Sequence, residues 1–171
     1  RGILDWDTPV TWIDTSDMDF KEEFVGETFG RINKEEAHLL LKELEAYILR
    51  IGGSRILEER IDFGLISPYK AQVQYLRGKI KGSATLRPYR SLITVNTVDG
   101  FQGQERDVIF ISLVRANEEG QIGFLNDLRR MNVAITRARM KLVILGEAAT
   151  LGHHAFYKQL LEYVKKVNGR Q

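Results

Sequence analysis

Two almost uninterrupted apolar runs place the tightest constraint on what this chain can fold into. They are Val108–Val114 (VIFISLV) and Lys141–Leu145 (KLVIL). A strand that is apolar at nearly every position is buried on both faces, as in a parallel sheet covered by helices. Both runs are far shorter than the ~20 apolar residues that cross a membrane, so we expect no membrane span.

Further strand and helix signals alternate along the chain. Three more β-prone segments precede those runs: Val10–Asp14, Ile61–Ser67 and Leu92–Val98. Apolar residues at helical spacing predict four helices: from the N-cap candidate Asn33 to Gly52, Tyr69–Lys81 opened by Pro68 at N1, Leu128–Arg139, and His154–Lys166. This alternation predicts a three-layer α/β domain with a mostly parallel sheet. Only about eight residues join the third and fourth strands, so these strands are either not neighbours or are linked by a single helical turn.

Composition and charge exclude some classes of function and favour others. The chain has no cysteine, which excludes disulfides and thiolate metal sites. Residues 1–62 carry 15 acidic and 8 basic side chains (net −7), whereas residues 63–171 carry 8 acidic and 17 basic ones (net +9). The basic part suggests binding to the phosphates of a nucleotide or a nucleic acid. We interpret the acidic part as a solvated face.

The segment Asn96–Glu105 (NTVDGFQGQE) follows the third predicted strand, at the kind of strand end where open parallel sheets bind ligands. Gly100 and Gly103 permit positive φ angles and a close approach of backbone amides to an anion. Polar side chains flank these glycines at Thr97, Gln102, Gln104 and Glu105. A tight turn that needs glycine for its geometry would have the same sequence, so both interpretations remain open for this loop alone.

The segment Leu128–Arg139 combines an apolar arc with a cluster of arginines. On one continuous helix, Arg129, Arg130 and Arg137 would share a face. The opposite, inward arc would consist of Leu128, Met131, Ala134, Ile135 and Ala138. Arginine suits phosphate because its planar fork makes two parallel hydrogen bonds and stays charged. The alternative is a solvated helix face whose arginines pair with acidic residues.

A third segment, Ile66–Gln72 (ISPYKAQ), turns from a strand directly into a helix. A hydroxyl group and free amides at a helix N-terminus can seat a phosphate. The alternative is an ordinary turn in which Pro68 sets φ and Tyr69 belongs to the core.

Together the three segments resemble the C-terminal RecA-like domain of superfamily 1 helicases, in the branch that includes the nonsense-mediated-decay RNA helicase and its DNA relatives. ISPYKAQ is similar to motif IV of that family, TVDGFQGQERDVIFISLVRAN to motif V and GFLNDLRRMNVAITRARMKLVILG to motif VI, in the family's order. The resemblance covers residues 61–146, roughly half of the chain. It implies a RecA-like fold of the P-loop NTPase type.

The resemblance also implies roles for individual residues. Arg137, in the tetrapeptide TRAR, would be an arginine finger that reaches the γ-phosphate of ATP. The residues implied to line the ATP side, together with Arg137, are Gln102, Gly103 and Glu105. The residues implied to touch the nucleic-acid backbone are Ser67, Pro68, Thr97 and Val98. No metal-binding residue is implied within this chain.

Two features of such motors are missing from the sequence. It contains neither a G-x-x-x-x-G-K-[ST] P-loop nor an acidic pair at a strand end that would hold Mg²⁺. In the family both features lie in the first RecA-like domain, so we expect ATP and Mg²⁺ to serve a longer protein, with neither bound by this chain alone. The start at Arg1, without an initiator methionine, favours the same interpretation. We expect residues 1–9 to be a linker, residues 10–168 the second RecA-like helicase domain and residues 169–171 a tail.

The implied function is that of the C-terminal motor domain of an ATP-dependent helicase or translocase, half of a catalytic unit. Its partners would be the preceding RecA-like domain of the same polypeptide and single-stranded DNA or RNA, in the cytoplasm or, in a eukaryote, the nucleus. Contacts to the backbone do not distinguish DNA from RNA. The alternative is a non-catalytic module that keeps the fold and binds nucleic acid or a protein, and the presence of Gln102, Glu105 and Arg137 counts against it.

Overall fold

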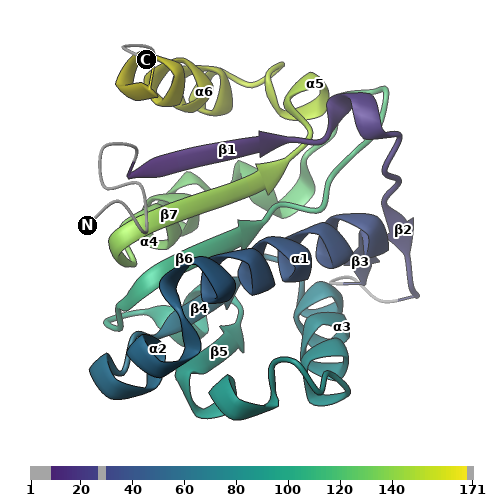
Figure 1. Ribbon diagram of the computed structural model, residues 1–171. Coiled ribbons are helices and arrows are strands. Elements are labelled where there is room, and N and C mark those ends of the chain that lie inside the picture. The colour runs from purple at the N-terminus through teal and green to yellow at the C-terminus, as the bar shows by residue number, and fades with distance from the viewer. Residues whose placement is uncertain (1–8, 27–29, 169–171) are drawn as a thin grey trace.

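A five-stranded parallel sheet forms the centre of the computed structural model, which describes residues 9–26 and 30–168 (Figure 1). The strands lie in the order β1-β7-β6-β4-β5. Their bounds are β1 Val10–Asp14, β4 Phe63–Ile66, β5 Ile93–Asn96, β6 Arg106–Ser112 and β7 Ala138–Gly146. The predicted parallel sheet is therefore confirmed, with β1 at one edge and β5 at the other.

Helices cover both faces of this sheet. One face carries α1 (Lys34–Ile51), α2 (Gly53–Glu59) and α3 (Lys70–Lys81), and the other carries α4 (Leu128–Ile135), α5 (Ala148–Leu151) and α6 (Ala155–Asn168). Successive residues of β6 and β7 pack alternately into two separate apolar clusters. This is why both strands are apolar at nearly every position. Within the described residues, no helix combines the length and apolarity that crossing a membrane requires.

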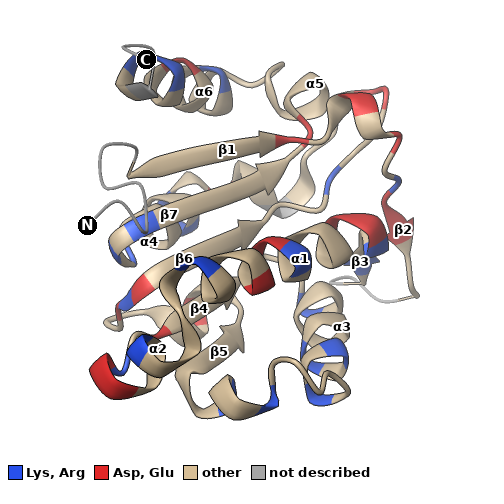
Figure 2. Ribbon diagram, in the orientation of Figure 1, with Lys and Arg blue, Asp and Glu red and all other residues tan. Residues whose placement is uncertain are grey.

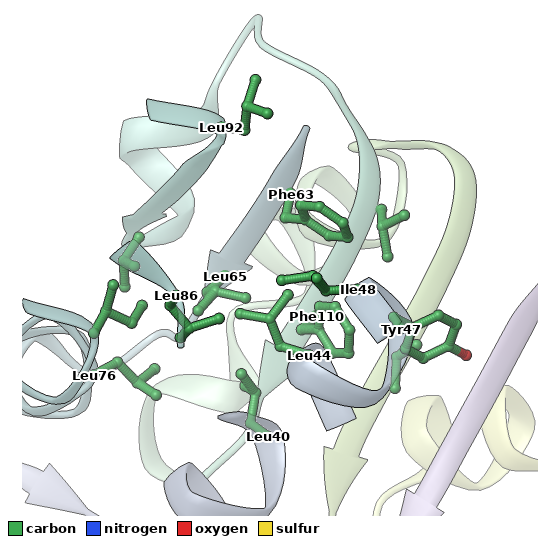
Figure 3. Packing of buried hydrophobic residues seen from close by; sticks show 14 of the residues in the cluster. Leu40, Leu44, Tyr47, Ile48, Phe63, Leu65, Leu76, Leu86, Leu92 and Phe110 are labelled. Atoms are coloured by element: carbon green, nitrogen blue, oxygen red, sulfur yellow. The ribbon is translucent and has the colours of Figure 1, made fainter. Parts of the chain in front are cut away.

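Figure 3 shows the cluster beneath α1. Leu40, Leu44 and Ile48 of α1 are buried at helical spacing and meet Leu65 of β4 and Phe110 of β6. The amphipathic pattern predicted after the Asn33 cap is thereby confirmed. Burying a side chain of this size contributes about 1.5–3 kcal/mol relative to leaving it exposed, so these few residues account for much of the attachment of α1.

The short connection between β5 and β6 resolves the question raised by its length. The two strands are not neighbours, because β4 lies between them and pairs with both. Their connection contains one turn of 3-10 helix, η3 (Val98–Phe101). The connection starts at the carboxyl end of β5 and returns to the amino end of β6. It therefore runs along the length of the strands, from their carboxyl ends to their amino ends.

The predicted helix over Leu128–Arg139 is too long. It ends at Ile135, because the chain enters β7 at Ala138, which pairs with Arg106. The Thr136 hydroxyl donates to the carbonyls of Asn132 (3.1 Å) and Val133 (2.9 Å) of the last turn. Arg137 therefore lies in the connection after the helix, and not on the face of Arg129 and Arg130. Leu128, assigned to the inward arc, is 39% exposed, whereas Met131 and Ala134 are buried as expected.

Three smaller differences concern the region before β4 and the start of α3. The glycine pair 52–53 ends α1 as predicted, but α2 begins at once, since Gly52 turns the chain with φ at +97°. The segment 18–32, to which the sequence analysis assigned neither a strand nor a helix, contains a two-stranded antiparallel ribbon of β2 (Glu23–Phe24) and β3 (Arg31–Ile32). Pro68 is not at N1, because Tyr69 is the N-cap and α3 starts at Lys70.

A buried polar network attaches α1 and α3 to the carboxyl end of β6. Glu36 Oε1 accepts hydrogen bonds from the Ser112 hydroxyl (2.5 Å) and from the amide of Val114 (2.8 Å). Gln72 Nε2 donates to Ser112 Oγ and to the carbonyl of Asn33, both at 3.0 Å. Asn33 in turn caps α1 by accepting from Glu36 N at 3.0 Å. The network thus ties two helices and one strand together through side chains that are almost fully buried.

Ionisation of the buried Glu36 carboxyl group destabilises the folded state. Burial raises its pKa from the ordinary value of 4.5 to about 7, although the hydrogen bonds from Ser112 and Val114 lower it, and the charge of Glu147 raises it further. Its second oxygen, Oε2, has no hydrogen-bond partner within the described residues. The folded state therefore binds a proton at this position more tightly than the unfolded state does.

We expect this difference to make stability fall between pH 4.5 and pH 7. Below pH 4.5 both states are protonated and the full stability is present; as the pH rises to 7, the unfolded chain ionises first, which removes up to about 3 kcal/mol. Urea unfolding at pH 5 and pH 8 measures this loss. Glu36→Gln cannot ionise and is the control, so the gap in unfolding free energy between the two proteins should change with pH. A gap that is equal at both pH values would contradict the assignment.

Candidate functional site

The predicted site residues lie at opposite ends of the parallel strands, some at the amino ends and others at the carboxyl ends. Glu105 immediately precedes β6 and Arg137 immediately precedes β7, so both lie at the amino ends of neighbouring strands. Ser67 follows β4 and Thr97 follows β5, at the carboxyl ends of another neighbouring pair. The expectation that the whole loop 96–105 lies at a carboxyl strand end is therefore wrong for its second half.

The two glycines of this loop are required for different reasons. At Gly100 a Cβ atom would fall 2.1–2.6 Å from the side-chain amide of Asn96, whose Oδ1 accepts from Thr97 N at 2.8 Å. Gly103 has open space around it, but its φ of +76° lies in the left-handed region. The first glycine therefore permits a close approach, and the second permits the turn that directs the chain toward β6.

Arg106 holds the second half of the loop in place. Its guanidinium donates to the carbonyl of Glu105 (2.7 Å), to Gln104 Oε1 (3.1 Å) and to the Thr94 hydroxyl (3.3 Å). The same guanidinium lies over the ring of Phe101, with its central carbon 5.4 Å from the ring centroid. Gln102, Gly103 and Glu105 are exposed on a loop that is fixed from beneath.

Arg137 is held beside this loop by neutral oxygen atoms. Its Nε donates to the carbonyl of Val133 (3.1 Å), Nη1 to the carbonyl of Gln104 (3.2 Å) and Nη2 to the Thr136 hydroxyl (3.2 Å). Its own carbonyl accepts from Arg106 N at 3.0 Å. Among the residues that the structure describes, no carboxylate forms an ion pair with Arg137. The guanidinium is therefore positioned, while its charge is not neutralised.

Two other arginines of the segment, Arg130 and Arg139, have acidic partners. Arg130 pairs with Asp99 (3.3 Å) and with Asp127 (3.4 Å), which also caps α4. Arg139 lies in β7, where it pairs with Asp62 and Asp107, both at 3.1 Å. The alternative of a solvated face paired with acids thus applies to Arg130. A small cleft of about 130 Å³ separates η3 from α4, and its lining residues are Val98, Asp99, Gln102, Arg129, Arg130 and Val133.

At the opposite edge, the predicted residues differ in their access to solvent. The Ser67 side chain is fully buried, and its hydroxyl accepts from Tyr69 N at 3.3 Å. Val98 is buried as well, whereas Pro68 and Thr97 are half-buried. Tyr69 belongs to the core, as the alternative interpretation of this turn proposed. The side chains that reach the surface at this edge are therefore those of Pro68 and Thr97.

One charged group was missed by the sequence analysis. Glu22 accepts from Arg115 Nε (3.0 Å), Ala116 N (2.8 Å) and Asn117 Nδ2 (2.9 Å). Burial raises the pKa of Glu22, but the hydrogen bonds from Asn117, Arg115 and Ala116 outweigh burial and lower it below its ordinary value. The acidic N-terminal part is therefore not only a solvated face. The partners are 93 residues apart, and no local pattern could have paired them.

Nowhere in residues 9–26 and 30–168 do three or more histidine, aspartate or glutamate side chains gather as metal ligands. The chemically distinctive feature is instead an unneutralised guanidinium beside an exposed glycine-containing loop. Such a group suits a phosphate, because arginine stays charged and offers two parallel N–H groups.

Comparison with known proteins gives a consistent result. Residues 2–149 match the family described as AAA domain. The chain is 38% identical over 143 residues to the probable helicase MAGATAMA 3 of Arabidopsis thaliana, covering 84% of this chain and 17% of that protein. It is 39% identical over 145 residues to the DNA polymerase alpha-associated DNA helicase A of Saccharomyces cerevisiae (84% and 20%). It is 38% identical over 149 residues to the regulator of nonsense transcripts 1 homolog of Drosophila melanogaster (85% and 12%).

The chain thus spans a fifth or less of the length of each of these relatives. The family match nevertheless covers most of the chain, from before β1 into α5, and includes all three motif segments. The parallel sheet with helices on both faces agrees with it. The chain therefore belongs to the AAA-domain family, in the group of C-terminal RecA-like domains found in superfamily 1 helicases.

Proposed function

We propose that this chain is the second motor domain of an ATP-dependent helicase or translocase that moves on single-stranded nucleic acid. It supplies an arginine finger, Arg137, and part of the track for the strand. It works only together with a first RecA-like domain that carries the P-loop and the Mg²⁺ ligands, since neither is encoded in these 171 residues. Support comes from the relatives, which are named as helicases.

The observation that carries this proposal is the state of the Arg137 guanidinium. It is oriented by three neutral acceptors, and it lies next to the exposed loop that contains Gln102, Gly103 and Glu105. A finger must be charged and pre-positioned before the phosphate arrives, because stabilisation of the transition state requires groups that do not reorganise. Arg137 meets both conditions, although it owes its rigidity to hydrogen bonds and not to a place within α4.

ATP with Mg²⁺ supplies the phosphoryl group and the free energy of its transfer to water. In this chain, Arg137 would stabilise the negative charge that develops on that group, and Gln102 and Glu105 would offer an amide and a carboxylate to the nucleotide. The strand would be held at the opposite edge, where Pro68 and Thr97 reach the surface. The loop from Thr97 to Glu105 joins these two edges, which supports a single domain that senses both ligands.

We expect Arg137→Ala, made in the complete protein, to abolish hydrolysis while leaving the domain folded. The turnover number should fall on the order of 10³-fold or more, about 4 kcal/mol of barrier, whereas stability should change by less than about 1 kcal/mol because only bonds to neutral surface acceptors are lost. Arg137→Lys should restore little activity, since an ammonium lacks the fork. Steady-state ATPase kinetics and thermal melting measure the two effects.

Arg139→Ala is the matched control, because Arg139 is two residues away but engaged by Asp62 and Asp107. It should retain ATPase activity and lose about 0.5–1 kcal/mol of stability, as expected for a partly exposed ion-pair cluster. An Arg137→Ala protein whose turnover stays within tenfold of the parent would refute the finger assignment.

We further expect the 171-residue chain alone to show no ATPase activity, with or without single-stranded DNA or RNA. It lacks the groups that cradle the phosphates and hold Mg²⁺. Phosphate release by the purified chain measures this directly. Turnover that persists through purification and disappears with Arg137→Ala would show that the chain is catalytically complete and would overturn the two-domain proposal.

A further inference from the structure

A long stretch of the chain contains basic residues and no acidic ones. Between Phe63 and Val98 there is no aspartate or glutamate. The same stretch contains six cationic side chains, which are Lys70, Arg77, Lys79, Lys81, Arg87 and Arg90. Such a local excess of one charge produces a positive potential that attracts polyanions.

The fold gathers these side chains around the edge strand β5. They belong to α3 and to the 3-10 helix η2 (Arg87–Leu92), and both elements pack against β5. Figure 2 shows basic residues along α3 and on the adjoining segment, with no acidic residue on that helix. All six side chains are exposed. In the part of the chain that the structure describes, none of them forms an ion pair with a carboxylate.

Three of these cations line one groove. An open groove of about 360 Å³ runs beside β5, with Arg77, Lys81 and Arg90 on its walls and Thr94 and Val95 in its lining. Arg77 is fixed there, since its Nε (3.1 Å) and Nη2 (2.7 Å) both donate to the carbonyl of Val95. The groove therefore has one guanidinium held in place by hydrogen bonds, and two further exposed cationic side chains along the edge of the sheet.

The groove lies along β5, which ends directly before Thr97 of the proposed track. β5 spans four residues and is followed at once by Thr97, so at about 3.3 Å per residue the groove extends roughly 13 Å back from that strand end. Its other end, at Arg90 and Ile93, lies at the amino end of β5, and Thr94 in its lining accepts a hydrogen bond from Arg106 at 3.3 Å. A single small anion would need only one or two of these cations, whereas a row of charges beside an open groove suits a backbone with regularly repeated phosphates.

We propose that this basic groove, defined by Arg77, Lys81 and Arg90, binds the phosphate backbone of single-stranded nucleic acid and extends the track beyond Thr97. The inference rests on the proposed function, because it assumes that the strand passes the carboxyl end of β5. Binding is independent of sequence, since the groove presents cations and no exposed aromatic ring on which bases stack.

The test measures binding of a fluorescein-labelled 20-nucleotide oligo(dT), and of oligo(U), to the 171-residue chain by fluorescence anisotropy at 25–200 mM NaCl. The groove variant is Lys81→Ala/Arg90→Ala. The control is Lys158→Ala/Lys166→Ala, which removes two exposed charges from α6, a helix that packs on β1 at the other edge of the sheet. Circular dichroism and thermal melting verify that both variants are folded.

We expect the groove variant to bind about tenfold more weakly at 50 mM salt and the slope of log K against log salt to become shallower by roughly 1.4, or 0.7 per lost phosphate contact. The control should remain within twofold of the parent. Groove and control variants that bind equally well would overturn the proposal.

A further variant, Thr97→Asp, separates this inference from the proposed function. If Thr97→Asp weakens binding and the groove variant does not, the strand end is retained as a track and the groove is rejected. If the parent chain itself shows no salt-dependent binding to either oligonucleotide, the strand track and its extension are both rejected.

Discussion

The hydrogen bonds that Glu36 Oε1 accepts from Ser112 and Val114 are the point at which α1 is joined to the central strand of the sheet. Through Asn33 and Gln72 the same network reaches α3. Val114 has a φ of +70°, a conformation that costs a β-branched residue about 1–3 kcal/mol and persists only where its surroundings impose it. Both its amide and its carbonyl are bound by this network. The carboxyl edge of the sheet, and with it the exit of β4 into α3, therefore depends on a few buried polar side chains.

A parallel sheet also separates the two proposed sites. All strands begin at one edge and end at the other, so residues before β6 and β7 cannot meet residues after β4 and β5. The connection from Thr97 to Glu105 is the exception, since it leaves one edge and arrives at the other. Asn96 fixes its start and Arg106 fixes its end. This places a braced segment between the exposed strand end and Arg137, whose Nη1 donates to the carbonyl of Gln104 within that segment.

Tertiary contacts decide which charged side chains of this molecule are paired and which remain unpaired, and composition alone does not show this. The acidic N-terminal part supplies two carboxylates, Glu22 and Glu36, that bind buried or half-buried partners far away in the sequence. These two carboxylates are thus unavailable to neutralise the exposed cations of α3 and η2. Arg137 and Arg130 show the same contrast at short range, since both belong to one predicted arginine cluster and only Arg130 has an acidic partner. Periodicity could not predict this, because it depends on where η3 brings Asp99.

The sequence by itself determined the five strands of the main sheet, the cap at Asn33, the parallel character of that sheet and the identity of the helicase motifs. Apolar periodicity and motif spacing are local properties, so they can be read before the chain is folded. Tertiary structure alone decided where α4 ends, since pairing of Ala138 with Arg106 draws the chain into β7 and takes Arg137 off the helix. It also decided the partners of Glu22 and Glu36 and the position of the basic groove. These depend on contacts between residues tens of positions apart, whose energies arise only once the sheet has brought them together.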